Sequence, residues 1–191
     1  MQAIIQDILG FWFAPAHATH WFAADAGFDA QIRGHFGDAV EAAVLGRLDD
    51  WTAEPAGWLA LLLLLDQFSR NLHRGYARAW VGDVKAQRVA LSGIARGDDR
   101  RLPPQQRVFA YLPLEHAEDM ALQQRSVELF ELLAAEVDAE QHPCFSGYLD
   151  YARRHRDVIA RFGRFPHRNA ALGRINTPEE ESYLAEPGAG F

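Results

Sequence analysis

Residues 58–68 read Trp-Leu-Ala-Leu-Leu-Leu-Leu-Leu-Asp-Gln-Phe, the most apolar stretch of the chain. A helix of this sequence would be apolar on every face, which is typical of a helix buried at the centre of a protein. Leucine and alanine, rather than valine and isoleucine, favour helix over buried strand. Its apolar run, Trp58 to Leu65, is far too short to cross a membrane and stops at Asp66. The stretch therefore predicts a central helix with the rest of the chain packed around it.

Helical spacing of apolar side chains extends through the segments on both sides of this stretch. It predicts helices over the ranges 4–13, 28–44, 77–97, 105–137 and 148–162. The fourth range is interrupted at Pro113. Residues 177–180, Thr-Pro-Glu-Glu, predict the capped start of a last helix. Since no alternating pattern predicts a strand, we expect a single all-α domain over 1–191, with roughly eight helices.

Composition and charge limit the classes of function. The chain has 191 residues, 49% of them apolar, and a net charge of −7, so binding to nucleic acid or to an anionic membrane is not favoured. Cys144 is the only cysteine, and neither an intrachain disulfide nor a cysteine-based zinc site is predicted. The first residues lack the basic segment of a signal peptide. We expect a cytoplasmic protein that acts on neither nucleic acid nor membranes.

Positive charge is concentrated in residues 151–174, which hold seven arginines and one acid. The most distinctive part is 161–169, Arg-Phe-Gly-Arg-Phe-Pro-His-Arg-Asn. Pro166 disfavours a helix interior and Gly163 permits backbone angles that other residues resist, so a shaped loop is expected. Arginine forks, an imidazole and an amide on such a loop suit a carboxylate or phosphate. The candidate ligand-binding residues here are Arg164, His167, Arg168 and Asn169.

An acidic counterpart lies at residues 113–119, Pro-Leu-Glu-His-Ala-Glu-Asp. If the proline opens a helix, Glu115, Glu118 and Asp119 share one helical face. Acids near a helix start are stabilised by the helix dipole, which is the ordinary interpretation. Three convergent carboxylates would nevertheless repel one another unless they met cations, and the arginines of the loop are the expected partners. His116 lies beside them as a candidate acid or base.

A third polar motif follows the apolar stretch, at residues 66–71, Asp-Gln-Phe-Ser-Arg-Asn. Asp66 and Arg70 are four residues apart and are expected to pair on one helical face. Asn71 is expected to cap the helix end. Such pairs and caps are usually structural, and a ligand-binding role for the three residues is the alternative. No metal or cofactor is predicted, because Glu-His-x-Glu occurs once and His-Glu-x-x-His is absent.

Four motifs, in order, resemble those of a bacterial family that is catalogued only as a domain of unknown function. They are residues 8–13, 65–71, 112–119 and 161–180. The resemblance implies an all-helical, tetratricopeptide-like fold of antiparallel helix pairs. It marks motif positions without roles at Asp66, Arg70, Asn71, Glu115, His116, Glu118, Arg164, His167, Arg168 and Asn169. Ser69 stands where that family is expected to have proline, so the helix is expected to continue more regularly there.

Two functions and one structural alternative remain open. The first function is a helical binding module for a small anionic ligand or a partner peptide's carboxylate. Its polar recess would be lined by Asp66, Arg70, Asn71, Glu118, Asp119, Arg164, His167, Arg168 and Asn169. The second is a small-molecule, hydrolytic enzyme with His116 or Glu115 as base and Arg164 and Arg168 stabilising negative charge. The structural alternative is a buried polar lock without a ligand. The sequence indicates neither the ligand nor the oligomeric state.

Overall fold

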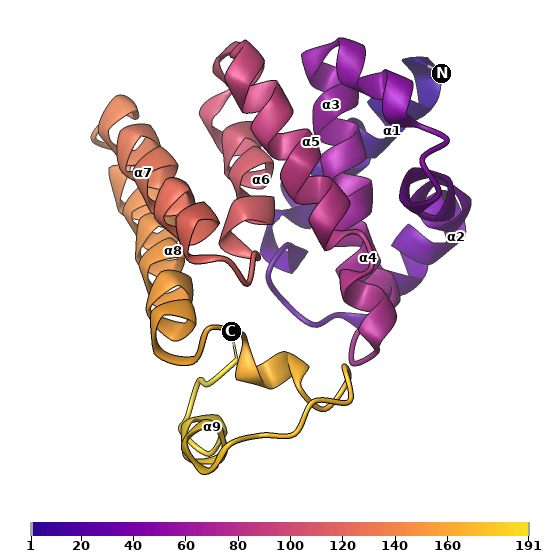
Figure 1. The fold of residues 1–191 in the computed structure, drawn as a ribbon. Helices are drawn as coiled ribbons and strands as arrows, with labels where there is room; N and C mark the ends of the chain where they lie inside the picture. The colour runs from indigo at the N-terminus through magenta and orange to yellow at the C-terminus, as the bar shows by residue number, and fades with distance from the viewer. Residues whose placement is uncertain (1, 191) are drawn as a thin grey trace. The chain divides into compact units, whose positions relative to one another are not determined.

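The computed structural model describes residues 2–190, which form nine α-helices and no β-strand (Figure 1). The all-α class expected from the sequence is confirmed. The described residues fall into two compact units. The first extends to Arg74 and continues over Arg78–Pro113, and the second comprises Gly75–Ala77 and the residues from Leu114 onward. The single domain expected from the sequence over 1–191 stays a prediction.

The first unit is built around its most apolar helix. Its helices are α1 (Gln2–Trp12), α2 (Ala26–Val44), α3 (Pro55–Leu63), α4 (Ser69–Leu72), α5 (Asp83–Arg96) and all but the end of α6 (Pro104–Glu115). Short 3-10 turns lie at Pro15–His20, Asp49–Ala53 and Asp99–Arg101. Helix α3 packs between α1 and α5 (Figure 1), and every side chain from 58 to 65 is fully buried. The central helix predicted from these residues is therefore confirmed.

The central helix changes its geometry before it ends. Residues Leu64–Phe68 form a π-helical segment, and α4 resumes at Ser69. The Ser69 hydroxyl donates a hydrogen bond to the carbonyl of Leu64 at 3.0 Å, so a side chain enters the backbone ladder at this point. Gly82 packs on the widened turn, since a Cβ there would lie 2.5 Å from the Leu65 carbonyl oxygen. The more regular helix expected from Ser69 is therefore wrong.

Three predicted helix boundaries are also wrong, each for a local reason. The helix expected over 77–97 begins only at Asp83, because Ala77–Trp80 forms a 3-10 turn. Pro113 does not open a helix but lies in the last turn of α6. The helix expected from 148 begins at His142, with a proline in its first turn, where no N–H is needed.

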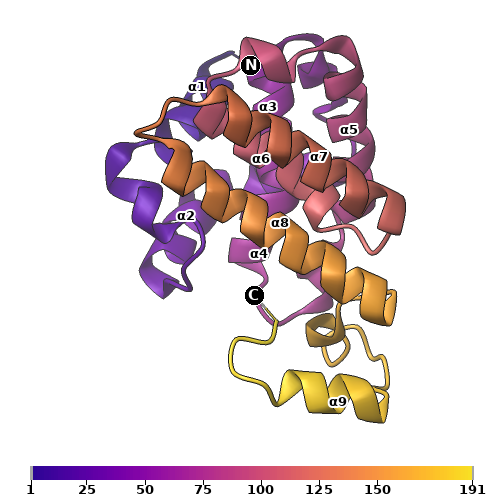
Figure 2. The same cartoon turned by 90° about the vertical axis from the view of Figure 1, so that its left-hand side faces the viewer.

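The second unit contains a long helix pair and a C-terminal segment. Helices α7 (Met120–Glu136) and α8 (His142–Phe162) run antiparallel and side by side (Figures 1 and 2). This pair is compatible with the tetratricopeptide-like arrangement. A 3-10 turn at Pro166–Arg168 and helix α9 (Pro178–Leu184) follow. An apolar cluster joins these parts, and its members are Val158, Ile159, Phe162, Phe165 and Tyr183.

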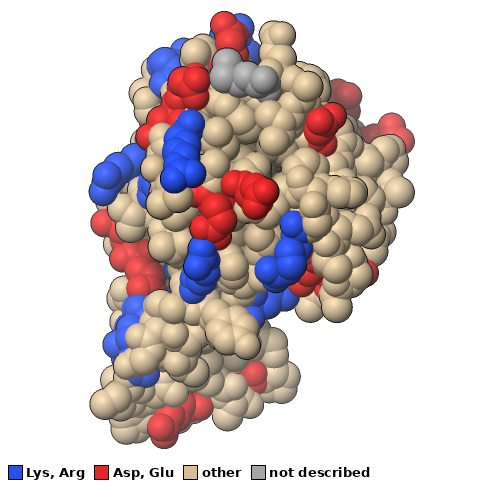
Figure 3. All heavy atoms as spheres, turned by 90° about the vertical axis from the view of Figure 1, so that its right-hand side faces the viewer, with Lys and Arg blue, Asp and Glu red and all other residues tan. Residues whose placement is uncertain are grey.

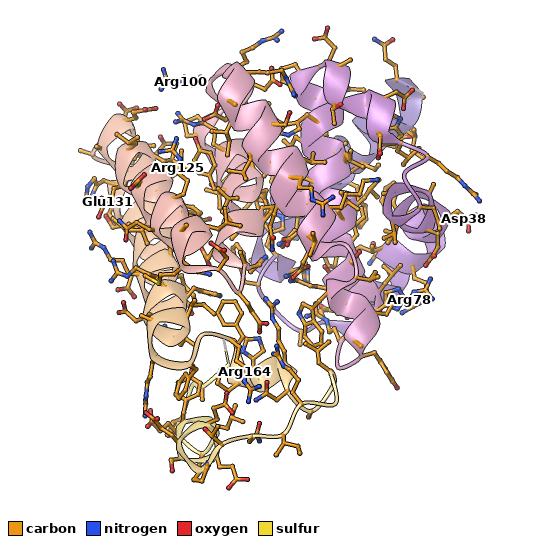
Figure 4. All side chains as sticks on the ribbon, in the orientation of Figure 1. Asp38, Arg78, Arg100, Arg125, Glu131 and Arg164 are labelled. Atoms are coloured by element: carbon orange, nitrogen blue, oxygen red, sulfur yellow. The ribbon has the colours of Figure 1, made fainter. Side chains whose placement is uncertain are left out.

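Charged side chains of both signs are interspersed on the face drawn in Figure 3. Ion pairs tie neighbouring helices of the first unit together, such as Arg74 with Asp29 at 2.6 Å and Arg78 with Glu41. In the second unit, Arg125 and Glu131 of α7 are exposed side chains (Figure 4). Among the helices of residues 2–190, none combines the length and apolar character that crossing a bilayer requires.

Candidate functional site

The 66–71 motif forms an ion-pair network within the first unit. Arg70 Nη1 lies 2.9 Å from Asp66 Oδ1, which confirms the expected pair, and the guanidinium also binds both carboxylate oxygens of Asp83 at 3.0 Å. Both aspartates are buried. Burial opposes the charge of Arg70, but the two aspartates raise its pKa above the usual value. One guanidinium therefore joins the π-helical turn to the start of α5.

Asn71 does not cap a helix end, contrary to expectation. It lies inside α4, and its Nδ2 donates a hydrogen bond to Asp29 Oδ1 at 2.7 Å. Arg74 Nε binds the other oxygen of the same carboxylate at 2.6 Å. Asp29 therefore ties α2 to the end of α4. The contacts of Asn71 in this unit are structural, and its ligand-binding role stays a prediction.

In the second unit, the three acids of the 113–119 motif do not share a helical face. Helix α6 ends at Glu115, and Asp119 is the N-cap of α7, where its side chain accepts from the N–H of Leu122 at 2.9 Å. The prediction failed because the proline lies in the last turn of one helix rather than the first turn of the next. Gln123 Nε2 holds the connection by donating to the carbonyls of Glu115 and Ala117.

Glu118 does meet a cation, but outside the 161–168 loop. Arg174 binds its two carboxylate oxygens at 2.7 and 2.8 Å, and the N–H of Phe165 donates to it at 2.8 Å. Partial burial works against the charge of Glu118. The bonds from Arg174 and Phe165 and the charge of Arg168 nevertheless hold its pKa below the usual value. Glu118 therefore fastens the loop through its backbone as well as through Arg174.

Glu115 contacts a histidine that no sequence motif singled out. Its Oε1 lies 3.1 Å from Nδ1 of His155, and the same nitrogen lies 2.9 Å from the carbonyl oxygen of Tyr151. Both Glu115 and His155 are buried. The position of His155 along the sequence is the feature that could have identified it, because His155 lies on the same buried face of α8 as Ala152 and Ile159. A titratable side chain on an apolar helical face needs a partner.

Three histidines and one arginine gather around Phe165. We call His116, His155, His167 and Arg168 the histidine–arginine cluster. The ring centroids of His116 and His155 are 6.0 Å apart, and Phe165 lies 5.6 Å from His155 and 5.5 Å from His167. The guanidinium of Arg168 stacks over Phe165 at 4.6 Å and donates to the carbonyl of His116 at 3.0 Å. The 3-10 turn after Phe165 places His167 and Arg168 in this group.

The surroundings of His155 in the cluster lower its pKa. Burial is the largest of the causes that lower this pKa to about 3, and electrostatic interactions with His116, His167 and Arg168 act in the same direction. The hydrogen bond to the carbonyl of Tyr151 acts in the opposite direction. His155 is therefore neutral at physiological pH. The surroundings of His155 therefore disfavour a positive charge on its ring.

Arg164 and Asn169 face the C-terminal segment. Arg164, labelled in Figure 4, binds both carboxylate oxygens of Glu180 at 2.6 and 2.8 Å and the carbonyl of Ile175 at 2.9 Å. Asn169 is fully buried and donates to Asn176 at 2.8 Å. The capping box predicted for α9 is confirmed, with Glu180 as its acid. These contacts match the structural alternative, and ligand binding by Arg164 and Asn169 stays a prediction.

Replacing Glu180 with Gln is expected to lower stability by roughly 2 kcal/mol at pH 7, because charge-assisted bonds to a buried carboxylate are lost. The bonds from Arg164 are the main cause that lowers the pKa of Glu180 to about 2. The stabilisation is therefore complete above the unfolded pKa near 4.5 and disappears as the pH falls toward 2. Urea unfolding of both proteins between pH 7 and pH 2.5 checks this. A constant difference between them across that range would contradict it.

Among residues 2–190, no group of three or more histidine, cysteine or acidic side chains is arranged to hold a metal ion.

Several comparisons place the chain among known proteins. A comparison with curated proteins gave no match. A solved structure, that of a protein of unknown function from Agrobacterium tumefaciens, is 43% identical in sequence, with a TM-score of 0.85. The similarity covers 96% of this chain and 98% of that one.

Four sequence motifs, at residues 8–13, 65–71, 112–119 and 161–180, resemble those of a bacterial family. The model of one bacterial family matches residues 8–188, which is nearly the whole chain. The chain therefore belongs to the bacterial proteins of unknown function of the family DUF924.

Proposed function

We propose that the chain is a helical binding module whose histidine–arginine cluster binds a small oxyanion, such as a carboxylate or a phosphate. The observation that supports this most is the grouping of three imidazoles and one guanidinium in the second unit. Arg168 stacks over Phe165 at 4.6 Å, with the ring of His167 5.5 Å from the same phenylalanine. An anion in the cluster would offset the charge of Arg168, and imidazole and guanidinium groups are good donors to oxyanions. The net charge of −7 favours a small anion over nucleic acid. We place this binding in the cytoplasm.

Isothermal titration with inorganic phosphate and with citrate tests the proposal. Replacing His167 with Gln is expected to weaken binding about tenfold, because a charge-assisted hydrogen bond is worth about 1.5 kcal/mol or more. His167 is half-buried, so this replacement leaves the apolar cluster intact. His142→Gln is the matched control, since His142 is exposed and its ring lies 3.1 Å from the hydroxyl of Ser146, one turn along the same helix. Equal affinities in wild type and the His167 variant would contradict the proposal.

One observation supports a second candidate, a small-molecule hydrolase. A carboxylate on Nδ1 of a buried histidine is the arrangement that orients a general base, with Nε2 as the nitrogen that accepts the proton. The base would then be His155, with Glu115 orienting it, rather than His116. Arg168 would stabilise negative charge. Hydrolysis of carboxylic or phosphate esters by wild type but not by Glu115→Gln would support this candidate. Absence of turnover with stoichiometric phosphate binding would leave the binding module.

A further inference from the structure

We propose that residues 185–190, here called the C-terminal strap, cover His167 and gate the access of anions to the histidine–arginine cluster. The ligand in this inference rests on the proposed function. The covering contact is a matter of geometry within the second unit and can be tested without any ligand.

The strap is shaped to lie directly on His167. A Cβ built on Gly190 would be 3.0 Å from the Cβ of His167 and 3.5 Å from its Cγ. A side chain at position 190 would therefore force this pair apart. The backbone of Gly190 also has a φ of +96°, which residues other than glycine rarely adopt. Two independent features thus require glycine where the strap meets the ring.

The base of the strap is fixed close to the cluster. Glu180 in the first turn of α9 is buried and holds Arg164 through two hydrogen bonds. Tyr183 in the last turn packs against Phe162, with ring centroids 5.2 Å apart. Helix α9 therefore starts the strap from a defined place beside the end of α8.

The strap itself is held much more weakly than its base. Its backbone bonds are local turn bonds, in which the N–H groups of Ala185, Glu186 and Ala189 donate to carbonyls three or four residues earlier at 3.0 to 3.2 Å. Residues 185–188 are exposed, and only Ala189 and Gly190 are half-buried. Segments with few buried contacts and exposed backbone open at low cost in free energy. The strap can therefore lift from His167 while α9 stays in place.

A cover of this kind lowers the apparent affinity of the cluster. If an anion binds only when the strap is lifted, the observed dissociation constant equals the intrinsic one divided by the open fraction. Removing the strap should then tighten binding without any new contact. Placing a side chain at position 190 should have the same direction of effect, because it displaces the strap from the ring.

The test uses two variants with the wild-type protein. One is a chain truncated after Leu184, which lacks the strap. The other is full-length Gly190→Val, which retains the strap but has a side chain at position 190. Diethyl pyrocarbonate modifies accessible imidazoles, and peptide mass spectrometry gives the rate at each histidine. We expect modification of His167 to become about fivefold faster in both variants and phosphate binding to become tighter by about the same factor, because both depend on the open fraction. Modification of His142 should be unchanged.

The outcomes separate the two ideas. An unchanged rate at His167 in both variants overturns the cover, whatever phosphate does. A faster rate at His167 with unchanged affinity, in a protein that binds phosphate, overturns the gate. Failure of wild type and both variants to bind phosphate or citrate overturns the proposed function instead. Faster modification together with tighter binding supports the strap as a gate.

Discussion

Replacing Gly93 with Ala is expected to lower the free energy of unfolding by about 3 kcal/mol. A Cβ at this position would lie 2.2 to 2.5 Å from three atoms of the indole of Trp58. Trp58 is fully buried, and its Nε1 donates to the carbonyl of Val89 at 2.8 Å. The ring would have to move away from α5, which would break this hydrogen bond and remove packing contacts of the indole. The added methyl therefore acts on the contact between the central helix and its neighbour.

Thermal unfolding measures this effect against a matched control. Gly34 also lies inside a helix, but a Cβ there would meet nothing within 4 Å. Gly34→Ala is therefore expected to be neutral or to stabilise by about 0.5–1 kcal/mol, through helix propensity alone. The melting temperature should fall by roughly 6–12 °C in the Gly93 variant and not in the control. Equal melting temperatures in the two variants would refute the close packing of α5 on Trp58.

Replacing Arg70 with Met is expected to cost about 4 kcal/mol, because it removes the guanidinium between two buried carboxylates. Asp66 and Asp83 each lie within 3.0 Å of Arg70 and are almost wholly buried. Methionine has a similar volume, so the loss reports on charge rather than on a cavity. Arg70→Lys should fall between Met and wild type, because an ammonium keeps the charge but cannot bind Asp83 through two bonds.

Arg78 provides the control for this measurement. Its ion pair with Glu41 joins side chains that are 56% and 42% exposed, so Arg78→Met should cost less than about 1 kcal/mol. Both arginines belong to the first unit, and urea unfolding reports on both. If Arg70→Met proved as mild as Arg78→Met, the 66–71 motif would not be a structural lock. Its ligand-binding role would then become the leading explanation of the motif.

Local features of the fold were predictable from the sequence because they depend on neighbours along the chain. A run that is apolar on every face has to be buried, and residues 58–65 are. The capping box of α9 needs only Thr177 and Glu180, three residues apart, and it forms. The pair of Asp66 with Arg70 follows from helical spacing in the same way. The π-helical turn was not predictable, since it depends on Gly82 packing against it from another segment.

The candidate site shows where local reasoning ends. The sequence by itself determined the all-α class, the central helix and a cationic loop with the residue types for an oxyanion. Only the tertiary structure decided which charge meets which. Glu118 pairs with Arg174, 56 residues away, Arg164 with Glu180, and Glu115 with His155. Seven arginines in one segment are equivalent partners as long as only the sequence is considered, because Coulomb attraction depends on distance in space. The folded chain sets that distance through long-range packing, which no spacing along the sequence encodes.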